Sequence, residues 1–100
     1  MTATPSDERT VTAAVQVLPL HADVYPTVDR AIAAIKATGV RHVVCPMETV
    51  LEGTLDEVLA AAKAAHLACF EGGAEKVVTI IKIGDALGGS TIDDKLEHYR

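Results

Sequence analysis

The sequence predicts a single α+β domain, a ferredoxin-like βαββαβ sandwich with a short C-terminal helix. Apolar residues recur with a period of two in four short segments and with a helical period in two longer ones. These segments follow the order strand, helix, strand, strand, helix, strand, which is the split β-α-β arrangement. A chain of 100 residues, 49% of them apolar, buries one modest core, so we expect one domain over residues 11–100.

The first part of the chain contains a tail, a strand and a helix. Residues 1–10 are polar and aperiodic, which predicts a disordered tail. Residues 11–20 (VTAAVQVLPL) alternate as strands do, and Pro19 marks the end of this strand or an edge position. Asp23 is a typical helix-capping residue. The apolar stripe behind it predicts a helix that Gly39 terminates.

The middle of the chain predicts two strands and a second helix. Residues 40–47 and 49–53 are short and rich in β-branched side chains, and we expect Pro46 and Met47 to belong to the bend between the two strands. Thr54 and Glu57 have the spacing of a capping box. The helical periodicity that follows them ends at the glycine pair 72–73.

The last part of the chain predicts a strand and a short helix. Residues 76–84 (KVVTIIKIG) form the most strongly β-forming segment of the chain. A Gly-Gly-Ser loop follows at 88–90, and residues 91–100 predict a helix. Asp93 and Asp94 lie at the positive end of this helix dipole.

Both faces of the predicted sheet carry apolar side chains. In the last strand, Val78 and Ile80 lie on one face, whereas Val77 and Ile81 lie on the other. Because two helices cover only one face, the second face would expose an apolar patch to water. We expect a homo-oligomer, a dimer or tetramer, that buries this patch. Coverage by the terminal helix or by the N-terminal tail is the alternative.

The composition excludes several classes of protein. Nine Lys and Arg against fourteen Asp and Glu give a net charge of −5, which argues against a general binder of nucleic acid or of anionic membranes. No apolar run approaches the ~18 residues of a membrane-spanning helix, and residues 1–10 lack the pattern of a signal peptide. We therefore expect a cytoplasmic protein in which Cys45 and Cys69 are reduced, buried and inert.

Catalytic and metal-binding patterns are absent from the sequence. The histidines at 21, 42, 66 and 98 lack metal-ligand spacing, and no C-x-x-C or glycine-rich phosphate motif occurs. We expect neither a metal nor a cofactor. His66 lies on the apolar stripe of the second helix, where a hydrogen-bonded histidine at the core edge is expected.

One polar cluster interrupts the apolar central strands. It consists of Glu48, Thr49 and Glu52, and Lys82 interrupts the last strand in the same way. Carboxylates among apolar residues are costly unless they are paired or offered to a ligand. An ordinary Glu52–Lys82 ion pair between strands and a ligand-facing carboxylate both remain open.

Several segments together resemble a known family. They are Val15-Gln16-Val17-Leu18-Pro19, Val24-Tyr25-Pro26-Thr27-Val28-Asp29, Thr38-Gly39-Val40, M-E-T-x-x-E-G at 47–53, Gly73-Ala74, I-K-I at 81–83, and T-I-D-x-K at 91–95 with Tyr99-Arg100. In order and spacing they resemble the small thiamine-binding proteins of the YkoF-like group, in its short single-domain branch, over about residues 11–100.

The resemblance implies a ferredoxin-like fold, assembly into dimers or tetramers through the sheets, and binding of thiamine or its hydroxymethylpyrimidine precursor without a known reaction. An aminopyrimidine requires a carboxylate or carbonyl beside a donor, and Glu48 or Glu52 with Thr49 offers both. Tyr25 is the preferred partner for stacking on the ring, and packing of Tyr25 at an interface is the alternative. The expected ligand-binding residues are Tyr25, Glu48, Thr49, Glu52, Lys82 and Asp85.

We therefore expect a non-catalytic binding protein of the cytoplasm. Two alternatives belong to other classes. A small enzyme of the dimeric α/β-barrel type would need an acid or base, for which His21, His66 and Glu52 are the candidates. A structural module without a ligand would need none.

Overall fold

The computed structural model describes residues 8–20 and 23–99, and within them seven elements follow the expected order. They are β1 (Val11–Leu20), α1 (Val24–Ala37), β2 (Arg41–Val44), β3 (Thr49–Gly53), α2 (Leu55–Glu71), β4 (Lys76–Gly84) and α3 (Ile92–Glu97). The predicted tail lies largely outside the described residues.

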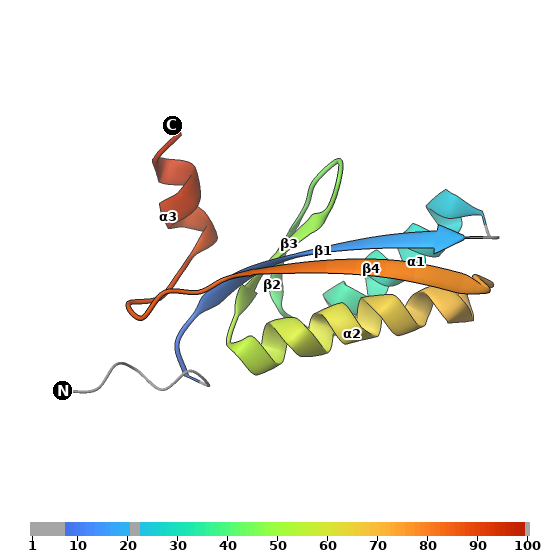
Figure 1. Ribbon diagram of the computed structural model, residues 1–100, viewed down its shortest axis with the longest axis horizontal. Coiled ribbons are helices and arrows are strands. Elements are labelled where there is room, and N and C mark those ends of the chain that lie inside the picture. Colours follow the sequence, from blue (N-terminus) through green and yellow to red (C-terminus); the bar gives the residue numbers. More distant parts are fainter. Residues whose placement is uncertain (1–7, 21–22, 100) are drawn as a thin grey trace.

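The four strands form one antiparallel sheet in the order β2-β3-β1-β4. The central strand β1 pairs with β3 over residues 11–15 and with β4 over residues 12–20. Figure 1 shows α1 and α2 along one side of the sheet and α3 at one end, away from them. The ferredoxin-like α+β fold predicted from the sequence is therefore confirmed.

The core lies between the sheet and the two long helices. Val11, Ala13 and Val15 of β1 are buried on this side, as the alternation predicted. Ile35 of α1 and Val58 of α2 are also among the most buried side chains. Three alanines of α2 have no exposed surface, and small side chains let a helix lie close to a sheet; they are Ala61, Ala62 and Ala65.

The two long helices begin where predicted, but only α2 has the predicted cap. Thr54 Oγ1 accepts the Glu57 N–H (3.2 Å), and Glu57 Oε1 accepts the Thr54 N–H (2.9 Å). The hydrogen bond that the Thr54 backbone donates to the Glu57 carboxylate, and after it that of the Thr54 side chain, lowers the pKa of Glu57. Asp23 occupies the N-cap position of α1, but its side chain accepts no capping hydrogen bond. The Thr27 hydroxyl instead donates to the Asp23 carbonyl (2.7 Å).

Two elements are shorter than predicted. β2 ends at Val44 because Cys45 and Glu48 close a turn around Pro46, with the Cys45 N–H donating to the Glu48 carbonyl at 2.9 Å. The predicted segment 40–47 is therefore a strand only over Arg41–Val44, and Pro46 and Met47 lie in the bend, as expected. α3 ends at Glu97, so it spans less than the predicted residues 91–100.

The sheet face opposite the helices is apolar and only partly covered. We call it the open face. Leu18, Val78 and Ile80 on this face are between 38% and 46% exposed. Ile92 at the start of α3 is only 6% exposed. The terminal helix therefore covers one end of the open face and leaves the rest bare.

Candidate functional site

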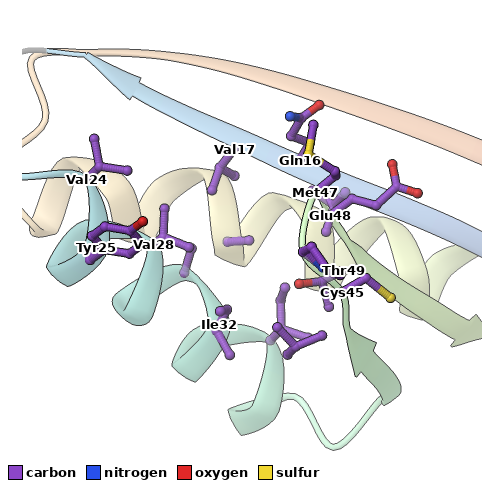
Figure 2. A pocket seen from close by; sticks show the side chains of 16 residues that line it. Gln16, Val17, Val24, Tyr25, Val28, Ile32, Cys45, Met47, Glu48 and Thr49 are labelled. Carbon is purple, nitrogen blue, oxygen red and sulfur yellow. The ribbon is translucent and has the colours of Figure 1, made fainter.

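A cavity of about 240 Å³ opens between α1 and the β2–β3 hairpin. In Figure 2, Val24, Val28 and Ile32 line it from α1, and residues 45–49 line it from the hairpin. Tyr25 lies at the N-terminal end of the α1 wall and is 83% exposed. Most of the lining is apolar, which is typical of small-molecule sites.

The cavity exists because β3 is shorter than β1. Pairing between the two strands stops at Val15, which lies opposite Thr49. β1 continues to Leu20, and among the described strands β4 alone accompanies it over residues 16–20. The space that a longer β3 would fill is left open beside β1. Helix α1 borders this space on the helix-covered side of the sheet.

Three of the predicted ligand residues meet at this cavity. Tyr25, Glu48 and Thr49 all line it, although the first is on α1 and the other two are on the hairpin. Thr49 is 6% exposed, so its hydroxyl belongs to the inner part of the site. Among the lining residues that the structure describes, Glu48 is the only one with a charged side chain.

Two further polar groups of the lining were not among the predicted ligand residues. Gln16 lies on β1 at the point where β3 ends, and Cys45 lies at the start of the hairpin turn. The signal for Gln16 was a single amide side chain within the mostly apolar segment 11–20. The expectation of a buried Cys45 is wrong, because the turn leaves its side chain partly exposed.

Glu48 also takes part in an ion pair on the open face. Lys82 Nζ of β4 lies 3.1 Å from Glu48 Oε1, and the two side chains meet across β1, where Ala14 lies opposite Lys82. A second, shallower cavity of about 350 Å³ on this face is lined by Lys82, Lys95 and Glu48 among others. Glu48 therefore borders both cavities.

Glu52 has partners away from the α1 cavity. Arg41, directly opposite on β2, binds Glu52 Oε2 (2.9 Å), and the Ile92 N–H donates to Glu52 Oε1 (2.8 Å). Arg41 also binds Asp93 (3.1 Å), and hydrogen bonds to Asp93 first and Glu52 second raise its pKa. The possible Glu52–Lys82 pair is thus replaced by Glu52–Arg41 and Glu48–Lys82, and Glu52 holds α3 against the sheet.

Asp85 also pairs with an arginine. Its carboxylate binds Arg9 Nε at 2.7 Å, just after β4 ends. The hydrogen bond from Arg9 lowers the pKa of Asp85, and the same bond raises the pKa of Arg9. Asp85 does not line the α1 cavity, so the structure does not bring it to the other predicted ligand residues.

The contacts of His66 and Cys69 are those of residues that support the fold. His66 Nδ1 lies 2.6 Å from Thr79 Oγ1, as expected of a hydrogen-bonded histidine at the core edge, and its ring meets Phe70 edge-on. Cys69 is fully buried, and burial raises the pKa of its thiol. His21 lies outside the described residues. Within residues 8–20 and 23–99, no cluster of three or more His, Cys, Asp or Glu could hold a metal ion.

Helices in the described part of the chain are all too short or too polar to cross a bilayer.

Comparisons with known proteins cover almost the whole chain. A family model described as thiamine-binding protein matches residues 13–100. A UPF0045 protein of Clostridium perfringens is 41% identical over 93 residues, which are 91% of this chain and 98% of that protein. A Bacillus cereus structure described as domain of unknown function DUF77 is 43% identical with a TM-score of 0.88, covering 97% of this chain and 96% of that one. A Thermotoga maritima structure with a provisional assignment to thiamine biosynthesis or salvage is 30% identical with a TM-score of 0.81, covering 91% and 99%.

Proposed function

Because this chain belongs to the thiamine-binding protein family, as its sequence resemblance indicated, we propose that it binds thiamine or the hydroxymethylpyrimidine precursor of thiamine and catalyses no reaction. The proposed site is the cavity between α1 and the β2–β3 hairpin. The observation that carries the proposal is the position of Glu48, the one charged side chain among the described lining residues, beside apolar walls.

The shape and size of the cavity favour a single substituted ring. Its volume of about 240 Å³ lies just below the roughly 300–1,000 Å³ of sites for drug-sized ligands. Val24 and Val28 offer an apolar surface to a ring, and Tyr25 offers an aromatic one. The pyrimidine half of thiamine therefore suits the interior, with the remainder of the molecule near the mouth.

The polar groups suit an aminopyrimidine. A carboxylate accepts hydrogen bonds from an exocyclic amine, and the Thr49 hydroxyl donates to a ring nitrogen or accepts from a donor. The negative charge of Glu48 also attracts the cationic thiazolium of thiamine. In this proposal Tyr25, Glu48 and Thr49 contact the ligand, and Lys82 acts on it through Glu48.

We also propose that the protein is a cytoplasmic homo-oligomer. The bare part of the open face, with Leu18, Val78 and Ile80, supports association of two copies through their sheets. Both cysteines are free thiols, which fits a reducing compartment.

Thermal unfolding with added ligand tests the proposal. A ligand at 100 times its dissociation constant adds about 2.7 kcal/mol to the free energy of unfolding. We expect thiamine or hydroxymethylpyrimidine to raise the melting temperature, and uracil to leave it unchanged. Mass spectrometry of the ligand after incubation should recover it intact. The absence of any shift at millimolar ligand would exclude the proposed function, and chemical conversion of the ligand would exclude the non-catalytic part.

A further inference from the structure

The hydrogen bond in the β2–β3 turn shows which side of each strand the backbone N–H and C=O groups near the cavity face. The Cys45 N–H donates to the Glu48 carbonyl at 2.9 Å, so the backbone of Glu48 faces the β2 side of the hairpin. In an antiparallel ladder successive residues direct their N–H and C=O groups to opposite sides. The backbone of Thr49 therefore faces away from β2, towards β1.

The same alternation continues into β1. Thr49 lies opposite Val15, so the backbone groups of Val15 face β3. The backbone of Val17, two residues further on, faces the same side, beyond Thr49, the first residue of β3. The Val17 N–H and C=O therefore point along the sheet into the space that forms the cavity, and Val17 lines that cavity (Figure 2). No strand in the described part of the chain pairs with this side of Val17.

The residue that follows on the same side agrees with this assignment. Pro19 is two positions beyond Val17, so its backbone nitrogen faces the side that β3 leaves. Proline has no N–H and occurs in sheets where no partner strand requires one. The edge of β1 over residues 16–20 that β3 leaves unpaired therefore offers one N–H donor, at Val17, next to carbonyl acceptors.

We propose that the backbone N–H and C=O of Val17 hydrogen-bond a planar heterocycle bound in the cavity and so select its ring. An aminopyrimidine presents a ring nitrogen that accepts and an adjacent amine that donates, which matches the donor and acceptor of one extended residue. This inference rests on the proposed function and names the group that selects the ring. An added peptide strand is disfavoured because this edge of β1 has a single N–H, at Val17, and such a strand needs several.

A proline substitution tests the backbone donor. Val17→Pro removes the N–H on the side without a partner strand, and Val17→Ala is the matched control for the lost side chain. We expect Val17→Pro to bind hydroxymethylpyrimidine about tenfold more weakly than Val17→Ala does, because one hydrogen bond is lost. Leu18→Pro removes an N–H that faces β4, so it should destabilise the fold far more than Val17→Pro. Equal ligand affinities for the proline and alanine variants at position 17 would overturn the inference.

Amide NMR gives a second readout on the unmodified protein. Without ligand, the Val17 N–H should exchange with solvent faster than the Leu18 N–H, and ligand should slow the exchange at Val17. The two hydrogens of the ligand's exocyclic amine would bond the Val17 carbonyl and the Glu48 carboxylate, so the 4-deamino analogue should bind at least tenfold more weakly. Ligand binding without protection of Val17 would overturn this inference alone, whereas failure of the protein to bind either ligand would overturn the proposed function with it. Protection of Val17 that rises with protein concentration alone would assign the edge to a second copy and overturn the inference.

Discussion

Lys82 reaches across β1 to Glu48, with its Nζ 3.1 Å from Glu48 Oε1, and so balances the charge of the one ionised side chain among the described residues that line the cavity. The Lys82 side chain is 68% exposed, whereas that of Glu48 is 26% exposed. Exposed ion pairs contribute little to stability, about 0–1 kcal/mol. We therefore infer that this pair matters more for the charge of the site than for the fold.

Removing the Lys82 charge should favour a cationic ligand. In Lys82→Met the Glu48 carboxylate is unpaired, so affinity for thiamine should rise about two- to fivefold while affinity for neutral hydroxymethylpyrimidine changes little. Isothermal titration calorimetry at low salt measures both. Lys76→Met, on the same face of β4, is the control. Equal changes for the two ligands would refute the assignment.

The two glutamates of the hairpin should differ in their effect on binding. Glu48→Gln removes the charge at the cavity and should weaken thiamine binding about tenfold. Glu52→Gln should leave binding near the wild-type level and instead loosen α3, because the one amide oxygen of glutamine cannot serve both the Ile92 N–H and Arg41, which the two carboxylate oxygens of Glu52 bind. Calorimetry reports the first effect, and faster hydrogen exchange at Ile92 reports the second. Weaker thiamine binding by Glu52→Gln than by Glu48→Gln would instead show that Glu52 is the ligand-binding carboxylate.

The two thiols should react at different rates. Cys45 lines the cavity and is partly exposed, whereas Cys69 is buried and its thiol pKa is raised. Because the thiolate is the reactive form, iodoacetamide should modify Cys45 first and Cys69 only on unfolding. Bound ligand should slow the reaction at Cys45. Peptide mapping by mass spectrometry distinguishes the sites, and unchanged labelling of Cys45 by saturating ligand would place the ligand elsewhere.

A charge on the open face should dissociate the proposed oligomer. Ile80→Lys places an ammonium group on this face, where Ile80 is 46% exposed. Ile83→Lys is matched in exposure, at 43%, but lies on the helix side of β4. Sedimentation should find the first variant at the monomer mass of 10.5 kDa and the second at the wild-type mass. A wild-type protein that already sediments as a monomer would contradict this proposal.

The capping box of α2 should contribute to stability in a pH-dependent way. Thr54→Ala should lower the free energy of unfolding by about 1 kcal/mol. The folded-state pKa of Glu57 lies below its ordinary value of 4.5, so the carboxylate stabilises the fold above that pH. The difference between the wild type and Glu57→Gln in urea unfolding should therefore persist at pH 7 and disappear as the pH falls through the lowered pKa. A difference that stays constant down to pH 2 would show that the carboxylate charge contributes nothing.

Features that depend on neighbouring residues were predictable from the sequence. The capping box at Thr54 and Glu57 needs only a spacing of three residues, and both bonds are present. The bounds of β3 and β4 match the predicted segments, because β-branched runs end at clear turn signals. Six ligand residues were predicted as one group, and only Tyr25, Glu48 and Thr49 of them line the α1 cavity.

Features that depend on strand register were not predictable. Lys82 lies opposite Ala14 and Glu52 lies opposite Thr12, and this offset leaves Glu52 to Arg41, its direct neighbour on β2. Sequence order does not reveal such an offset, because both carboxylates of the hairpin lie within five residues. The Val17 edge was missed for a related reason, since side-chain patterns say nothing about backbone groups that lack a partner strand.

The early end of β3 has one more consequence. Since pairing stops at Val15 and Thr49, two extra residues in each arm of the hairpin would bring a strand alongside Val17 and fill the opening. The length of the hairpin between Arg41 and Gly53 thus sets the size of the cavity opening. Lengthening or trimming this one segment would resize the entrance without altering a single core side chain.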